Sequence, residues 1–222
     1  MTFQIDINKK AIVEQTISLY SGIGWKKLFA RGRFWYAPYI EVEQLLPKSG
    51  KIIDLGCGEG VLTNYLGLSS DHRIVLGIDI DKKRIREASH GVKNVSFRSV
   101  DITKFKIPPC DGIIIFQVLH HLYSKSTQEE TIKHCADSLR KGGKLIIVEI
   151  YVGISINYFL TWIADHLLVA WFFEKKFYTH ILFRKLEDWK KYVESTGLSC
   201  NVINPNSKTK PFSNTILDCT KI

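Results

Sequence analysis

The stretch Ile52–Gly60, IIDLGCGEG, decides the fold of this chain. Apolar, β-favouring residues end at Asp54, and glycine then recurs at positions 56, 58 and 60 just before a helical pattern. Glycine tolerates positive φ and has no Cβ, so a turn of this kind brings the backbone close to a ligand. The backbone N–H groups and the helix N-terminus that follow favour a carboxylate or a phosphate. The stretch therefore predicts a strand, a turn and a helix, with a ligand site at the turn.

Between this stretch and Glu149, β-rich runs alternate with helical patterns. Strands separated by helices of roughly 10–15 residues imply βαβ units and a parallel sheet covered on both faces. Runs such as GIIIF and KLIIV are apolar without alternation, which is typical of strands buried on both sides. The predicted strands are Lys51–Leu55, Ile74–Ile78, Val95–Ser99, Gly112–Phe116 and Lys144–Glu149, and helices are expected from Gly60, from Lys82 and over Ser126–Arg140.

The flanking regions predict additional parts. Residues 1–47 are interpreted as an N-terminal cap of two or three helices, and residues 48–222 as the main domain. An apolar insertion is expected at about 152–185. A helix near Leu186–Thr196 and a final pair of strands joined by a turn-rich loop should follow. The expected final strands are Ser199–Asn204 and Ser213–Thr220.

Composition limits the class of protein. A chain of 222 residues fits one medium domain, and 45% hydrophobic with 24% charged residues is ordinary for a soluble protein. The five cysteines show no CxxC or zinc-like spacing, so we expect reduced thiols in a core and no metal site. The N-terminus MTFQIDINKK lacks the layout of a signal peptide, so a cytoplasmic location is expected.

The formal net charge of +9 comes from dispersed lysine and arginine residues. A compact basic run would favour nucleic-acid binding, and dispersed bases do not. Attraction to an anionic membrane or to an acidic substrate stays open.

The ends of the predicted strands carry acidic residues. In an open parallel sheet, ligands bind beyond the carboxyl ends of the strands. Asp79 ends the second strand in LGIDID, where a carboxylate can accept both hydroxyls of a ribose, and the adjacent Ile80 could pack on an adenine face. Asp101 follows the third strand, placed to accept a hydrogen bond from an adenine amino group. The segment FQVLHHL follows the fourth strand.

Taken together, DLGCGEG, GID, DI, VLHHL and LRKGGKL resemble the class I S-adenosylmethionine-dependent methyltransferases, especially the broad small-molecule group. The resemblance covers roughly Lys48–Tyr151, with Gln117 standing where many relatives have a small or acidic residue. It implies an α/β, Rossmann-like fold: a seven-stranded, mostly parallel sheet with an antiparallel last strand and helices on both faces.

The resemblance also implies the cofactor, S-adenosylmethionine, and the product, S-adenosylhomocysteine. The glycine loop would cradle the methionine part, Asp54 would hold its ammonium group, and Gln117 would lie nearby. Asp79 would hold the ribose, and Asp101 the adenine. The cofactor-binding residues implied in this way are Asp54, Gly56, Cys57, Gly58, Gly60, Asp79, Ile80, Asp101, Ile102 and Gln117.

A dinucleotide-binding dehydrogenase is the main competitor for the glycine turn. That class requires GxGxxG, whereas this chain has GCGEG followed by Val61 and no recognisable hydride-transfer apparatus. Methyl transfer from a sulfonium mainly requires alignment of a nucleophile and removal of its proton when needed. His120 and His121 are the candidate catalytic residues, and structural hydrogen bonding is the interpretation that we favour for this pair.

The segment ISINYFLTWIADHLLVAWFF, residues 154–173, is the best indication of the substrate. It is long enough to span a bilayer, but an ionised Asp165 near mid-span would cost about 2.5–3.5 kcal/mol. We expect a lid whose polar stripe faces the substrate, and a core helix without substrate contact remains the alternative. The candidate substrate residues are Asn157, Thr161, Asp165, His166 and His180.

The sequence thus predicts a methyltransferase that acts on a small or lipid-like apolar acceptor, at oxygen or carbon. The alternatives are an RNA or protein methyltransferase and a non-catalytic protein that binds an adenosyl ligand. Aromatic and basic residues occur together in GWKKLFARGRFWY and WFFEKKF, a combination that suits peripheral contact with an anionic membrane. The oligomeric state stays open.

Overall fold

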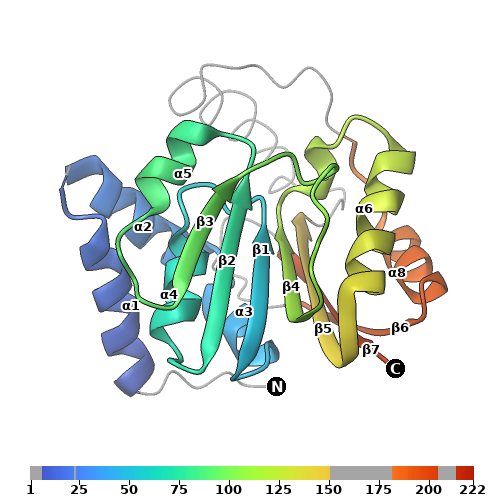
Figure 1. Cartoon of the computed structure of the whole chain (residues 1–222), viewed down its shortest axis with the longest axis horizontal. Coiled ribbons are helices and arrows are strands. Elements are labelled where there is room, and N and C mark those ends of the chain that lie inside the picture. The colour runs from blue at the N-terminus through green and yellow to red at the C-terminus, as the bar shows by residue number, and fades with distance from the viewer. Residues whose placement is uncertain (1–6, 23, 151–181, 205–213) are drawn as a thin grey trace.

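The computed structural model describes residues 7–22, 24–150, 182–204 and 214–222 (Figure 1). The described residues form one seven-stranded sheet. Its strands are β1 (Gly50–Leu55), β2 (Arg73–Asp79), β3 (Val95–Ser99), β4 (Cys110–Phe116), β5 (Leu139–Ile150), β6 (Leu198–Ile203) and β7 (Asn214–Lys221). Their spatial order is β3-β2-β1-β4-β5-β7-β6.

The first five strands run parallel to one another, and β7 runs antiparallel to both of its neighbours, β5 and β6. This arrangement confirms the predicted Rossmann-like sheet and its antiparallel last strand. In sequence order, the helices are α1 (Ile7–Leu19), α2 (Gly24–Tyr36), α3 (Tyr39–Leu45), α4 (Val61–Leu68), α5 (Lys82–Ala88), the short 3₁₀ helix η1 (Leu119–His121), α6 (Lys125–Ser138) and α8 (Leu186–Ser195).

Helices cover both faces of the sheet, and each face has its own apolar core (Figure 1). Successive strand residues point to opposite faces, so Ile52 and Ile53 are both fully buried in different cores. Helices α1, α3 and α4 pack on the face that holds Ile52, and α6 and α8 pack on the face that holds Ile53. Burial on both faces explains the uninterrupted apolar runs in the sequence.

The N-terminal helices α1, α2 and α3 join the core on the Ile52 face. Tyr20, directly after α1, donates its hydroxyl hydrogen to the Glu59 carbonyl oxygen at 2.8 Å and accepts from Asn64 Nδ2 at 3.0 Å. Glu43 in α3 forms a buried ion pair with Arg73 at 3.0 Å. These contacts hold the N-terminal helices against the glycine turn and the start of β2.

Two sequence expectations differ from the structure. The helix expected to reach Arg140 ends at Ser138, because Leu139 already pairs with Cys110 in the sheet and Arg140 Nη1 binds both Asp111 carboxylate oxygens at 2.9 and 2.8 Å. Cys200 and Cys219 are disulfide-bonded rather than reduced. They are directly opposite each other in the antiparallel β6–β7 pair, which brings their side chains together.

No helix among the described residues is long and apolar enough to cross a membrane.

Candidate active site

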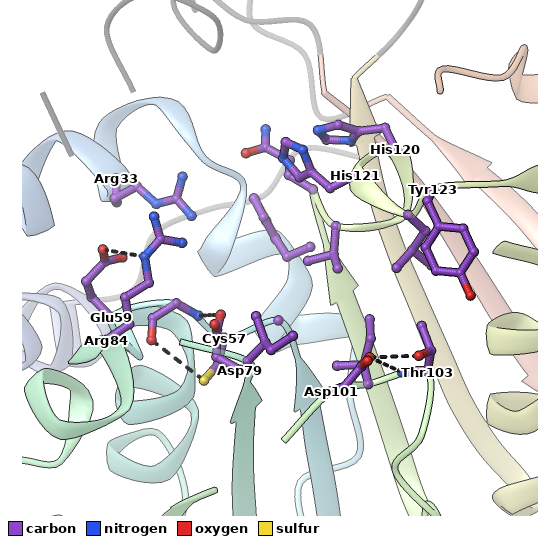
Figure 2. Close-up of a pocket in the computed structure, with 18 of the residues that line it drawn as sticks. Arg33, Cys57, Glu59, Asp79, Arg84, Asp101, Thr103, His120, His121 and Tyr123 are labelled. Carbon is purple, nitrogen blue, oxygen red and sulfur yellow. Dashed lines mark hydrogen bonds and ion pairs between the residues drawn. The ribbon is translucent and has the colours of Figure 1, made fainter. Parts of the chain in front are cut away.

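A cavity of about 370 Å³ opens at the carboxyl ends of β1, β2 and β4 (Figure 2). Strand β1 lies between β2 on one side and β4 on the other, so the chain order reverses at this point of the sheet. Such a switch in strand order leaves a crevice in which open α/β sheets bind ligands. The glycine turn, Asp79, Asp101, Gln117 and the two histidines all line this one cavity.

The glycine turn is built from left-handed residues, with φ of 79° at Gly56 and 53° at Gly58. A Cβ on Gly56 would lie 2.3 Å from Val118 Cγ2, whereas a Cβ on Gly58 would meet no atom within 4 Å. Gly58 therefore leaves room for a ligand at the cavity wall. Gly60 does not line the cavity, because a Cβ there would lie 2.7 Å from Ala88 and Phe97. Gly60 thus allows the turn to pack closely on Ala88 of α5 and Phe97 of β3, and its predicted part in cofactor binding stays a prediction.

Asp79 is held in a fixed orientation at the end of β2. Its Oδ2 accepts a hydrogen bond from the Gly58 backbone N–H at 2.9 Å, and its Oδ1 accepts from the Asp81 backbone N–H at 2.8 Å. A carboxylate oxygen has more than one acceptor site, so both oxygens can still accept from a ligand diol. This placement agrees geometrically with the predicted ribose site.

Asp101 lies across the cavity from the glycine turn (Figure 2). Its Oδ1 accepts from the backbone N–H and the hydroxyl of Thr103, at 2.9 and 2.8 Å. Ile80, which is 69% exposed, and the buried Ile102 line the same cavity. The two isoleucines offer apolar surface and Asp101 offers an acceptor, the combination that an adenine ring would use.

Asp54 does not line the cavity and is only 1% exposed. Its Oδ2 accepts a hydrogen bond from Thr63 Oγ1 at 2.6 Å, beneath the glycine turn. Burial raises the pKa of Asp54 to about 6, although the bond from Thr63 acts in the opposite direction. The predicted role of Asp54 at the cofactor ammonium stays a prediction. Cys57 lines the cavity, and burial raises the pKa of its thiol well above the ordinary value.

Gln117 follows β4 and adopts φ of 54°, a left-handed conformation that is unusual for a residue other than glycine. Its backbone N–H donates to the Val148 carbonyl oxygen, and its Nε2 donates to Asn214 Oδ1, both at 2.8 Å. Strained conformations of this kind occur often at ligand sites. These hydrogen bonds place Gln117 at the cavity wall.

The two histidines lie on η1, which follows β4, on the opposite side of the cavity from Asp79 (Figure 2). The buried His120 contacts Glu149 Oε2 through Nδ1 at 2.6 Å. Glu149 Oε1 also accepts from the Leu119 backbone N–H at 3.0 Å, so this carboxylate fixes both the helix and the ring. The His120 ring stacks on Phe183 with a centroid distance of 5.1 Å.

The sequence interpretation missed Glu149 and Arg33. Glu149 is near the end of β5, so the rule that places sites at strand ends could have found it. Arg33 lines the cavity from α2, and its Nε donates to the Tyr39 hydroxyl at 2.8 Å. The guanidinium carbon lies 5.4 Å from the Tyr36 ring centroid and 5.7 Å from the Phe116 ring centroid. No local pattern marks Arg33, because its place depends on how α2 packs.

The predicted substrate residues Asn157, Thr161, Asp165, His166 and His180, with most of the predicted lid, lie outside the described residues. Within the described ranges, no group of three or more His, Cys, Asp or Glu side chains could hold a metal ion.

Residues 29–201 match a family described as a methyltransferase domain, and the chain belongs to this family. This confirms the resemblance to the class I S-adenosylmethionine-dependent methyltransferases. Among curated proteins, the chain is 29% identical over 168 residues to the mitochondrial ubiquinone biosynthesis O-methyltransferase of Bos taurus, which covers 71% of this chain and 44% of that protein. The chain spans less than half the length of such curated relatives.

Solved structures confirm the fold. A magnesium protoporphyrin IX methyltransferase from Synechocystis PCC 6803, solved with bound S-adenosylhomocysteine, has a TM-score of 0.59 and 21% identity, covering 100% of this chain and 90% of that chain. An N-methyltransferase from Bradyrhizobium japonicum WM9, also solved with S-adenosylhomocysteine, has a TM-score of 0.62 and 15% identity, covering 96% and 98%.

Proposed function

We propose that this protein transfers a methyl group from S-adenosylmethionine to a hydroxyl oxygen of a small or lipid-like apolar acceptor, with carbon as the second candidate atom. One observation carries the proposal. A single cavity has Asp79 and Asp101, at the ends of β2 and β3, on one side (Figure 2). His120, which contacts Glu149, lies on the opposite side of the same cavity. The cavity thus combines groups suited to a nucleoside with a group suited to accept a proton.

The cavity residues fit S-adenosylmethionine. Asp79 is suited to the ribose diol and Asp101 to the adenine amino group, since both are acceptors fixed by backbone contacts. Arg33 offers a permanent positive charge for the carboxylate of the methionine end. When bound, S-adenosylmethionine supplies an activated methyl group.

The acceptor is proposed to be apolar because aromatic and aliphatic side chains share the cavity with these polar groups. Oxygen is favoured as the accepting atom by the His120–Glu149 pair, because methylation of a hydroxyl releases a proton. The similarity to O-methyltransferases of ubiquinone biosynthesis supports the same atom. The apolar lining residues are Phe29, Phe116, Val118, Leu122 and Tyr123.

His120 is proposed as the general base. A carboxylate accepts from Nδ1–H, so contact with Glu149 fixes the tautomer in which Nε2 accepts a proton. With S-adenosylmethionine bound, the acceptor oxygen would take the methyl group from its sulfur, and Nε2 of His120 would accept the hydroxyl proton. Glu149 stabilises the resulting imidazolium, and S-adenosylhomocysteine is the second product.

The test measures transfer of labelled methyl from S-adenosylmethionine to phenols with and without apolar tails. Glu149→Gln would present an amide N–H to His120 Nδ1 and so favour the wrong tautomer. We expect kcat to fall by roughly 10²–10⁴-fold with unchanged affinity for S-adenosylhomocysteine. The exposed His134 on α6 provides the matched control, as His134→Gln.

Three outcomes would contradict the proposal in different ways. Tight binding of S-adenosylhomocysteine without turnover of any acceptor would favour a non-catalytic binding protein. Turnover of RNA or protein alone would refute the acceptor class. Full activity of Glu149→Gln on a hydroxyl acceptor would refute the role of His120 and leave methyl transfer intact.

A further inference from the structure

Helix α2 carries an apolar stripe that faces solvent. Trp25, Leu28 and Trp35 are 50%, 72% and 62% exposed. With 3.6 residues per turn, positions 25, 28 and 35 fall on one side of the helix. The other sides of α2 place Ala30 in the core and Phe29 at the cavity. An exposed stripe of large apolar residues beside a ligand cavity marks an interaction surface.

Unpaired basic residues accompany this stripe. Helix α5 lies beside α2, and the two are joined by an ion pair between Lys26 and Glu87 at 3.3 Å (Figure 1). Lys27 in α2 and Lys82, Lys83 and Arg86 in α5 are exposed. These four side chains form no ion pair within the part of the chain that the structure describes.

The acidic residues of this region are already engaged. Glu14 pairs with Arg31, Glu59 with Arg84, and Glu87 with Lys26. Asp81 accepts from backbone N–H groups at the start of α5. The surface therefore has an excess of positive charge, and its natural partner is anionic. We call it the α2–α5 surface, consisting of Trp25, Lys27, Leu28, Trp35, Lys82, Lys83 and Arg86.

We propose that the α2–α5 surface binds the face of an anionic phospholipid bilayer. Lysine and arginine side chains are attracted to anionic headgroups, and tryptophan prefers the boundary between headgroups and acyl chains. A nucleic acid would also attract the bases and stack on tryptophan. It would give no role to Leu28, the most exposed member of the stripe, whereas a bilayer accommodates leucine in its apolar layer.

Bilayer binding would place the cavity close to lipid. Phe29 and Arg33 line the cavity from α2, and Arg84 lines it from α5. The two helices that form the proposed surface therefore also form one wall of the ligand site. An apolar acceptor could move from the bilayer into the cavity without crossing bulk water. The binding itself goes beyond the proposed function and does not depend on methyl transfer.

The test is flotation of the whole protein with vesicles of phosphatidylcholine alone or mixed with phosphatidylglycerol. We expect binding only to the mixed vesicles, and weaker binding as salt rises. The double variant Lys82→Gln/Lys83→Gln should lower vesicle affinity roughly 30-fold. Leu28→Ser/Trp35→Ser should lower it roughly tenfold or more. Unchanged affinity for S-adenosylhomocysteine would show that both variants fold.

Matched controls lie elsewhere on the molecule. Ile74 is 62% exposed at the start of β2, away from the cavity, and Lys191 is exposed on α8. Ile74→Ser and Lys191→Gln should bind vesicles as the wild type does. The proposal is overturned if the wild type does not bind anionic vesicles, or if it binds RNA and no vesicles. It is also overturned if the control variants lose as much vesicle affinity as the surface variants.

Discussion

Removal of the Asp79 carboxylate should weaken binding of S-adenosylhomocysteine by a predictable amount. The carboxylate is held by the backbone N–H groups of Gly58 and Asp81, at 2.9 and 2.8 Å, and keeps acceptor capacity on the cavity side. Each hydrogen bond from a ribose hydroxyl to a charged acceptor is worth about 1.5–3 kcal/mol. Asp79→Ala should therefore raise the dissociation constant roughly 10²–10⁴-fold.

Calorimetry with two ligands separates a lost ribose contact from a distorted loop. The second ligand is an analogue of S-adenosylhomocysteine that lacks the two ribose hydroxyls. Wild type should bind the analogue more weakly than the natural ligand, whereas Asp79→Ala should bind both with similar affinity. This coupling between a side chain and two hydroxyl groups is the signature of direct contact.

The neighbouring Asp81 supplies the matched control. Its side chain accepts from the backbone N–H groups of Lys83 and Arg84 as the N-cap of α5. Asp81→Ala should lower the free energy of unfolding by about 1 kcal/mol and leave ligand affinity unchanged. If Asp79→Ala and removal of the hydroxyls weaken binding additively, the assignment of Asp79 to the ribose is wrong.

Two predictions concern the glycine turn and the buried acid beneath it. Gly56→Ala, with a Cβ 2.3 Å from Val118, should lower the free energy of unfolding by roughly 2–4 kcal/mol, against about 1 kcal/mol for Gly58→Ala, which meets open space. Urea unfolding checks both, and equal losses would contradict the geometry. Folding raises the pKa of Asp54 from 3.8 to about 6. The protonated carboxyl therefore contributes to the free energy of unfolding in full below pH 3.8, and this contribution is lost as the pH rises through about 6. Across this pH range, the free energy of unfolding of the wild type should fall by about 3 kcal/mol more than that of Asp54→Asn. If the free energies of unfolding of the two proteins change in parallel with pH, the prediction is wrong.

The sequence predicted the sheet well because its signals are local. Apolar runs such as that of β4, followed by glycine or acidic residues, are sufficient to position the parallel strands and the turns between them. The strand-end rule also brought Asp79, Asp101 and Gln117 to one cavity, since parallel strands meet at one edge. Their placement needed only the order of elements.

Other features depend on packing that no local pattern encodes. Asp54 lies near a strand end as Asp79 does, but its side chain points beneath the turn to Thr63. Its orientation depends on the position of α4, which carries Thr63. Arg33 reaches the cavity because α2 places its guanidinium beside the rings of Tyr39 in α3 and Phe116 in β4. The Cys200–Cys219 bond requires the register of β6 on β7, which the spacing of cysteines does not reveal.

The hydrogen bond from Gln117 to Asn214 links the ligand site to the order in which the chain is synthesised. Asn214 begins β7, which is last in sequence among the described strands yet lies between β5 and β6 in space. A nascent chain on the ribosome therefore leaves β6 without its neighbour, and the Gln117 side chain without its Asn214 partner, until that segment emerges. The predicted contribution of Gln117 to cofactor binding should accordingly arise late in translation, after the other described strands have been made.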